Sequence, residues 1–280
     1  MNFRRRALRI IITGLAGAVA AAVVAPAVSS TGPAASATPS EWTLTSTSDN
    51  STLAYNQGLA TGGGLLHGRG YLTIRPELAA EGWTHIGDQD IYRSETYDAY
   101  ENLDAGRKLY AVTGRDGAVR RYYHRLAPGE LANNSFVTVD PSGKYLVSGE
   151  WKVQKRLLVF ANPRAQRSGS QVPLVGQINL DQPLENVQSC DFVDATRLVC
   201  AVDKPRQAVY SVWLSRPLTS GTTVTGRVTH DFDVPKHSAC KGGYEVEGID
   251  YDARRKLLSV GIIDPSPCLL NTKVFRYARR

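Results

Sequence analysis

From Trp42 onward, apolar and polar residues alternate with a period of two in short runs, and clusters of glycine, aspartate, asparagine and proline separate these runs. Alternation of this kind predicts β-strands with one buried face, because successive side chains of a strand point to opposite sides. No long apolar pattern with a helical period interrupts the runs. The pattern therefore predicts an all-β chain.

One hairpin pattern recurs three times, at 136–147, 190–200 and 246–260. Each copy has an apolar strand, an aspartate that begins a turn, a basic residue and a second apolar strand. The turn aspartates, Asp140, Asp194 and Asp250, are 54 and 56 residues apart. This spacing suits four-stranded blades with generous loops, and it predicts a single β-propeller of five or six blades. A β-sandwich would also explain the alternation, but it would not explain the near-constant spacing.

Propellers commonly close by pairing the two ends of the chain in one blade. The last predicted strand, 273–277, offers a suitable edge, and 42–47 is the first predicted strand after the N-terminal segment. We therefore expect these two segments to pair. No long proline-rich or serine-rich linker divides 38–280, and its length suits one large domain with a well-buried core.

Residues 1–37 have the layout of a secretory signal peptide. Four arginines stand within the first nine residues, 10–25 carry no charge, and Ala35-Ser36-Ala37 matches a cleavage site. The uncharged run is shorter than the roughly 20 residues that span a bilayer. We expect cleavage after Ala37 and a secreted, extracellular protein without a membrane anchor. The sequence leaves the export route, Sec or twin-arginine, open.

The N-terminal arginines account for more than half of the formal net charge of +7. In the rest of the chain, lysine and arginine are scattered among acidic residues. This is typical of a solvated surface of mixed charge and argues against a nucleic-acid partner. We expect a monomer whose partner is an extracellular ligand, carbohydrate or protein.

The cysteines, Cys190, Cys200, Cys240 and Cys268, all lie in the C-terminal third of the chain. In an exported protein they are expected to form disulfides. Cys190 and Cys200 are equidistant from the centre of one predicted turn, so they should face each other across a hairpin. Cys240 and Cys268 are likewise equidistant from Arg254. We therefore predict 190–200 and 240–268, and no zinc site, because no suitable Cys or His spacing is present.

Acidic residues occupy related positions before the hairpin turns. Three and five residues before the turn aspartates lie Val137 and Ser135, then Asp191 and Ser189, then Glu247 and Glu245. An earlier segment, 85–92, places Asp88 and Asp90 on one face of a strand. If these strands are the innermost of their blades, the acids converge at the channel mouth. The predicted ligand-binding residues are Gln57, His85, Asp88, Asp90, Asp191, Glu245 and Glu247.

Converging carboxylates repel each other, and a cation, a raised pKa or a neighbouring base can relieve the repulsion. Hard oxygen ligands suit Ca²⁺ better than zinc. We therefore consider a calcium site formed by Asp88, Asp90, Asp191 and Glu247. Such acids can also serve only as hydrogen-bond acceptors for neighbouring backbone amides. The only catalytic candidate is His85, because His67, His124, His230 and His237 are expected in turns or at the surface.

The segments His85-Ile-Gly-Asp88-Gln-Asp90, Phe136-Val-Thr-Val-Asp140 and Glu245-Val-Glu247-Gly-Ile-Asp250 resemble inner-strand hairpins of secreted propellers. The resemblance is to the broad gluconolactonase-like, NHL-like grouping, and it spans 57–277. Enzymes of that grouping hold a divalent cation, often calcium, in the channel and hydrolyse lactones or esters. The resemblance implies such a part for Asp88, Asp90, Asp191 and Glu247.

Two functions follow from these patterns. The first is an exported binding protein that uses the channel mouth and its loops, which the absence of a familiar catalytic motif favours. The second is a calcium-dependent hydrolase of lactones, esters or phosphoesters, in which the metal polarises a carbonyl or activates water.

Overall fold

The computed structural model describes residues 41–131, 135–268 and 271–280. The predicted signal peptide, 1–37, lies outside these residues. The described chain is all-β apart from the short helices α1 (Thr52–Tyr55) and α2 (Pro76–Ala79) and four 3-10 turns. These turns are η1 (Tyr71–Thr73), η2 (Leu103–Ala105), η3 (Pro163–Ala165) and η4 (Leu218–Ser220).

The strands form four sheets. Within each sheet, most strands that follow one another along the chain pair as antiparallel hairpins, and β11 also pairs in parallel with β14. The first sheet has only β2 (Gly58–Gly62) and β3 (Leu65–Arg69). The second contains β4 (His85–Tyr92), β5 (Glu95–Glu101), β6 (Arg107–Thr113) and β7 (Val119–Arg125). The last contains β15 (Glu245–Asp252), β16 (Leu257–Ile263), β17 (Asn271–Arg279) and β1 (Trp42–Ser51).

The remaining sheet has seven strands and is joined by one long strand, β11 (Leu174–Asp194). The first part of β11 pairs with β10, and its second part pairs with β12. The other members are β8 (Thr138–Val139), β9 (Tyr145–Ser148), β10 (Val153–Ala161), β12 (Arg197–Lys204), β13 (Ala208–Leu214) and β14 (Val224–Asp233). One strand therefore serves two consecutive groups of strands.

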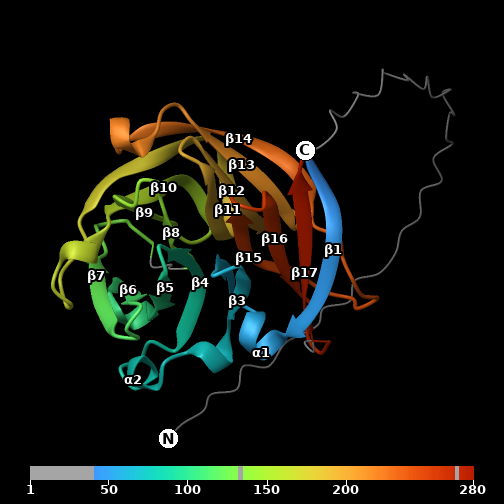
Figure 1. Cartoon of the computed structure of the whole chain (residues 1–280), viewed down its shortest axis with the longest axis horizontal. Helices are drawn as coiled ribbons and strands as arrows, with labels where there is room; N and C mark the ends of the chain where they lie inside the picture. Colours follow the sequence, from blue (N-terminus) through green and yellow to red (C-terminus); the bar gives the residue numbers. More distant parts are fainter. Residues whose placement is uncertain (1–40, 132–134, 269–270) are drawn as a thin grey trace, which may run out of the picture. The chain divides into compact units, whose positions relative to one another are not determined.

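The two ends of the domain meet in one sheet, as predicted. Strand β1 pairs with β17, with Thr47 opposite Phe275 and Trp42 opposite Arg279. Figure 1 shows β1 in blue beside β17 in red, although they come from opposite ends of the described chain. The outer strand of the last sheet is thus supplied by the start of the domain.

The first strands of successive groups contact one another. Strand β2 contacts β4, β4 contacts β8, β8 contacts β11, β11 contacts β15, and β15 returns to β2. A Cβ atom on Gly248 in β15 would lie 2.6 Å from the backbone nitrogen of Leu59 in β2, so this approach requires glycine. A two-sheet sandwich does not provide such a cyclic set of contacts, which argues against the alternative fold.

Both predicted disulfides are confirmed. Cys190 and Cys200 are direct partners across β11 and β12, with Cα atoms 4.0 Å apart, and they lie in a buried apolar cluster. The Cα atoms of Cys240 and Cys268 are 6.5 Å apart. The first pair joins neighbouring strands, whereas the second ties the segment before β15 to the segment after β16.

The third predicted turn aspartate is a correction. Asp250 does not begin a turn, because it lies inside β15 opposite Ser259 and is buried. Asp252 begins the turn instead, and its Oδ1 accepts hydrogen bonds from the backbone nitrogens of Arg254 and Arg255. The hairpin loop is therefore shorter than the sequence pattern indicated, and Asp250 belongs to the strand and not to the loop.

Candidate functional site

One polar side chain from each first strand lies near the C-terminal end of that strand. These residues are Thr61 in β2, Asp90 in β4, Thr138 in β8, Asp191 in β11 and Asp250 in β15. Because the five strands contact one another in a cycle, their equivalent ends meet at one place. We call this set the polar ring.

Hydrogen bonds within the polar ring connect one strand to the next. Asp250 accepts from the backbone nitrogen of Thr61 at 2.9 Å and from its hydroxyl at 2.6 Å. The Thr138 hydroxyl lies 3.0 Å from Asp191 Oδ1 and 3.3 Å from Asp90 Oδ2. The carboxylates of the ring thus bridge separate sheets, which is a structural role in its own right.

Backbone amides of the neighbouring strands also donate to the ring carboxylates. Asp90 Oδ2 accepts from the nitrogen of Val139 at 2.6 Å, and Asp191 Oδ2 accepts from the nitrogen of Tyr251 at 2.7 Å. These bonds hold the carboxylates in fixed positions. The carboxylates of the ring are therefore held rigidly, in positions that do not depend on a ligand.

The ring carboxylates are acids with raised pKa values. Burial raises the pKa of Asp90 to about 6, and the nearby charge of Asp250 adds to the effect. Burial raises the pKa of Asp191 well above its usual range, and the charges of Asp90 and Asp250 raise it further. The pKa of Asp250 is also raised by burial. Part of the ring can therefore carry protons near neutral pH, and a protonated carboxyl donates as well as accepts.

A pocket of about 920 Å³ opens above the polar ring. Asp90, Asp191 and Asp250 line it together with residues of the hairpin turns that follow the first strands. Its apolar walls include Ile91, Tyr92, Phe192 and Tyr251, and its basic residues are His67, Arg69, Arg93, Arg254 and Arg255. A concave site with apolar walls and a few fixed polar groups is typical of small-ligand binding.

The other predicted acids lie apart from the pocket: Asp88 and Glu247 are buried, whereas Glu245 is exposed. Asp88 accepts hydrogen bonds from the backbone nitrogens of Leu59 at 2.6 Å and Gln89 at 2.8 Å, and from the Ser189 hydroxyl. Burial raises the pKa of Asp88 well above its usual range. Glu247 is buried as well, and burial followed by the charges of Asp203 and Glu245 raises its pKa. Asp88, Glu245 and Glu247 do not line the pocket.

The contacts of the described residues do not test the predicted calcium site. Calcium requires several oxygen atoms that point at one centre. Both carboxylate oxygens of Asp191 and of Asp250 already accept hydrogen bonds. Within the described ranges, no group of three or more acidic, histidine or cysteine residues could hold a metal ion. Calcium binding by Asp88, Asp90, Asp191 and Glu247 stays a prediction without support from these contacts.

Two further predicted site residues lie apart from the pocket. His85 begins β4, and its Nδ1 lies 3.2 Å from a carboxylate oxygen of Glu101, which is its register partner in β5. The other end of β4 enters the pocket, so His85 is at the far end of the strand. Gln57 precedes β2, is half-buried, and donates its backbone N–H to the carbonyl of Arg69. Neither residue lines the pocket.

Sequence reasoning missed several residues of the site. It treated Asp250 as a turn residue, and it did not single out Thr61, Thr138 or the arginines of the turns. The sequence did offer a second candidate for the start of this turn, because Asp252 follows Asp250 by two residues. Arginines in turns carry no comparable signal.

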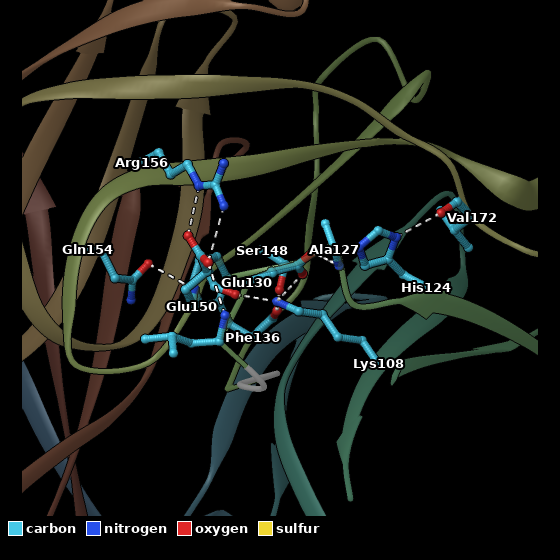
Figure 2. Close-up of polar contacts among 12 residues, drawn as sticks. Lys108, His124, Ala127, Glu130, Phe136, Ser148, Glu150, Gln154, Arg156 and Val172 are labelled. Carbon is cyan, nitrogen blue, oxygen red and sulfur yellow. Dashed lines mark hydrogen bonds and ion pairs between the residues drawn. The ribbon is translucent and has the colours of Figure 1, made fainter. Parts of the chain in front are cut away.

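A second polar cluster, shown in Figure 2, lies at the ends of β6 and β7 that are remote from the pocket. The Lys108 side chain is buried, donates to the carbonyl of Gly149 and lies 3.7 Å from Glu130 Oε1. His124 Nε2 lies 2.9 Å from Glu130 Oε2. His124 is buried, whereas the sequence had predicted it in a turn or at the surface. Burial lowers the pKa of Lys108 to about 8. We call Lys108, His124 and Glu130 the buried ion cluster.

The raised pKa values predict that the protein is more stable at pH 5 than at pH 7. A carboxyl whose pKa is raised on folding stabilises the native state while it is protonated, and that stability is lost as pH rises through the native pKa. For Asp90, whose native pKa is about 6, the loss is on the order of 3 kcal/mol when fully developed. Thermal melting at pH 5, 6 and 7 should show a falling melting temperature.

Asp90→Asn serves as the control for this pH dependence, because asparagine still accepts a hydrogen bond from Val139 but cannot ionise. The melting temperature of the variant should fall less between pH 5 and pH 7 than that of the wild type. A wild-type melting temperature that is constant or rises over this interval would contradict the assignment.

The chain was compared with family models, with curated proteins and with solved structures. No family model matches it, and no curated protein matches it. Among solved structures, the chain is similar to the structure of the Dos1 propeller, with 11% sequence identity and a TM-score of 0.33. The match covers 73% of this chain and 57% of the Dos1 chain. Similarity at this level carries no argument about function. None of the helices in the described ranges is long and apolar enough to cross a membrane.

Proposed function

We propose that the chain is an exported, single-domain β-propeller of five blades that binds a carbohydrate ligand in the pocket above the polar ring. The cyclic contacts of β2, β4, β8, β11 and β15 support five blades around a channel. In this arrangement β11 closes one blade and opens the next, while β1 completes the last blade. The first blade, with β2 and β3 alone, is the shortest.

Export is supported by the predicted signal peptide and by the two disulfides. Disulfides persist in oxidising compartments and are rare where thiols are kept reduced. The chain has no free cysteine among its described residues, and each pair lies within disulfide distance. A secreted propeller therefore accounts for the N-terminal pattern and for the cysteines together.

The pocket is the observation that carries the binding function. Its floor presents carboxyl groups that can accept and donate hydrogen bonds, and the half-buried Tyr92 supplies aromatic surface on its wall. Sugars combine hydroxyl groups with apolar faces, so they match both features. The calcium-dependent hydrolase is kept as the alternative, because Asp90 and Asp191, two of its proposed metal ligands, also line this pocket.

The binding function can be tested with the full chain, expressed so that the host exports it, with an N-terminus expected at Thr38. The recovered protein is applied to an array of neutral and acidic oligosaccharides, and the affinity of the strongest binder is measured by calorimetry. Ala253→Trp places an indole at the pocket mouth, because Ala253 is exposed and lines the pocket. We expect this variant to bind at least about tenfold more weakly, which corresponds to about 1.4 kcal/mol.

Ala118→Trp is the matched control, because Ala118 is an exposed alanine in the turn between β6 and β7 and does not line the pocket. It should bind like the wild type. Binding that is equal in all three proteins would place the ligand elsewhere, and the absence of any binding on the array would refute the carbohydrate proposal.

A further inference from the structure

Two arginines at the pocket mouth have no acidic partner among the described residues. Arg93 lies in the turn between β4 and β5, is exposed, and its guanidinium carbon lies 5.2 Å from the Tyr92 ring centre. Arg254 lies in the turn between β15 and β16 and is also exposed. By contrast, Arg69 is paired with Asp98 at 2.6 Å. The mouth therefore presents two guanidinium groups that are available to a ligand.

These two arginines stand on either side of a low wall. The hairpin between β2 and β3 contributes Gly62, Gly63 and Gly64 to the pocket lining, and none of them has a side chain. Strand β2 contacts both β4 and β15, whose turns carry Arg93 and Arg254. Arg255 Nη1 also donates to the carbonyl of Gly64 at 2.7 Å. The glycine hairpin is therefore flanked by positive charge.

Inside the pocket, Gln89 has an unused hydrogen-bond acceptor. Gln89 is one of the residues that line the pocket, and it is only 4% exposed. The Nε2 atom donates to the carbonyl of His67 at 2.9 Å, whereas the buried Oε1 atom has no hydrogen-bond partner. A buried amide oxygen without a donor destabilises the structure, because it has lost its hydrogen bonds to water. Because this oxygen has no exposed surface, a ligand hydroxyl would reach it once the Gln89 side chain turned toward the pocket.

We infer that the ligand is an acidic saccharide, a sugar that bears a carboxylate. Its hydroxyl groups bind Gln89 and the polar ring, and its carboxylate lies at the mouth between Arg93 and Arg254. A planar guanidinium matches a carboxylate with two parallel hydrogen bonds, which gives orientation as well as affinity. A longer acidic chain can leave the pocket over the glycine hairpin. This inference rests on the proposed carbohydrate-binding function and specifies the class of carbohydrate.

The test compares a hexuronic acid oligosaccharide with the same oligosaccharide after its carboxylates have been reduced to neutral alcohols. The exported wild-type protein should bind the acidic form at least about tenfold more tightly, since one charged hydrogen bond contributes about 1.5–3 kcal/mol. Affinity for the acidic form should also fall as salt is raised, because exposed charges are screened. The double variant Arg93→Ser/Arg254→Ser should lose this preference and still bind the neutral form as before.

The control is Arg206→Ser/Arg216→Ser, which removes the same charge from exposed positions outside the pocket. It should keep the preference for the acidic form. Equal affinity for both oligosaccharides would overturn the inference and leave the carbohydrate-binding function intact. A preference for the acidic form that survives in Arg93→Ser/Arg254→Ser would overturn it as well. If neither oligosaccharide nor any other sugar on the array binds, the proposed function itself fails.

Discussion

Replacing Arg197 with alanine is expected to lower the free energy of unfolding by about 3–5 kcal/mol, the usual cost of removing one partner from a buried ion pair. The Arg197 side chain is 1% exposed and is paired with Glu41 and with Asp231, whose carboxylate oxygen lies 3.3 Å away. It also donates to the Ser211 hydroxyl at 2.7 Å. Without Arg197, the Asp231 carboxylate would keep hydrogen bonds from Ser211 and Trp42 but would lose its paired positive charge.

Aromatic contacts add to the expected effect of Arg197→Ala. The guanidinium carbon lies 4.3 Å from the Trp213 ring centre and 5.5 Å from the Trp42 ring centre. Because Trp42 begins β1, this stack ties the strand that closes the domain to β12 and β13. The variant should therefore weaken the closure of the domain as well as the local ion pairs.

Urea unfolding of the exported protein measures the loss, with two further variants as controls. Arg197→Lys keeps the charge but loses the planar stack, so it should lie between the wild type and Arg197→Ala. Arg206→Ala removes an exposed partner of Asp233 and should cost less than about 1 kcal/mol. A value for Arg197→Ala within about 1 kcal/mol of the wild type would show that the cluster contributes little.

Lys108→Met is expected to cost a similar amount, about 3–5 kcal/mol, because it leaves the Glu130 carboxylate buried with less compensating charge. Both side chains are 1% exposed (Figure 2). Methionine keeps most of the volume of lysine, so the loss reports on charge and hydrogen bonding more than on a cavity. The free energy of unfolding, measured by urea denaturation, checks the value.

The double variant Lys108→Met/Glu130→Gln separates the ion pair from the packing. Glutamine can still accept a hydrogen bond from the backbone nitrogen of Ala127, which Glu130 Oε2 accepts at 3.1 Å in the wild type. Removing both charges should therefore cost less than removing the lysine alone. If the loss in the double variant equals the sum of the losses in Lys108→Met and Glu130→Gln, the two residues do not act as a pair.

Much of the fold could be predicted because strands have a short period. Alternation placed most of the strands, and the symmetry of the hairpins selected the pairing of Cys190 with Cys200 and of Cys240 with Cys268. The pairing of β1 with β17 was predicted from the need to close the domain. The signal for the strands is local, and the signal for the disulfides comes from residues at equal distances from one turn. The pairing of β1 with β17 rested instead on a general property of the fold class.

The candidate site was predicted only in part. The sequence brought Asp90 and Asp191 to one place, and the structure adds Thr61, Thr138 and Asp250. It separates Asp88 and Glu247, which lie deeper, and His85, which lies at the other end of its strand. An error of two residues in the third turn was enough to move Asp250 from the pocket to a loop, because it placed the end of β15 before Asp250.

The amino-acid sequence by itself determined that the chain is all-β and how its cysteines pair. It also determined that acids lie on the first strands of several groups, and all three results depend on period and spacing. Only the tertiary structure decided which acids meet, because the distance between side chains of separate sheets depends on how the strands stack, and no local pattern encodes that. It also showed that most of these carboxylates accept hydrogen bonds from neighbouring amides. The repeated hairpin thus specifies a scaffold, while the pocket is defined by contacts between repeats.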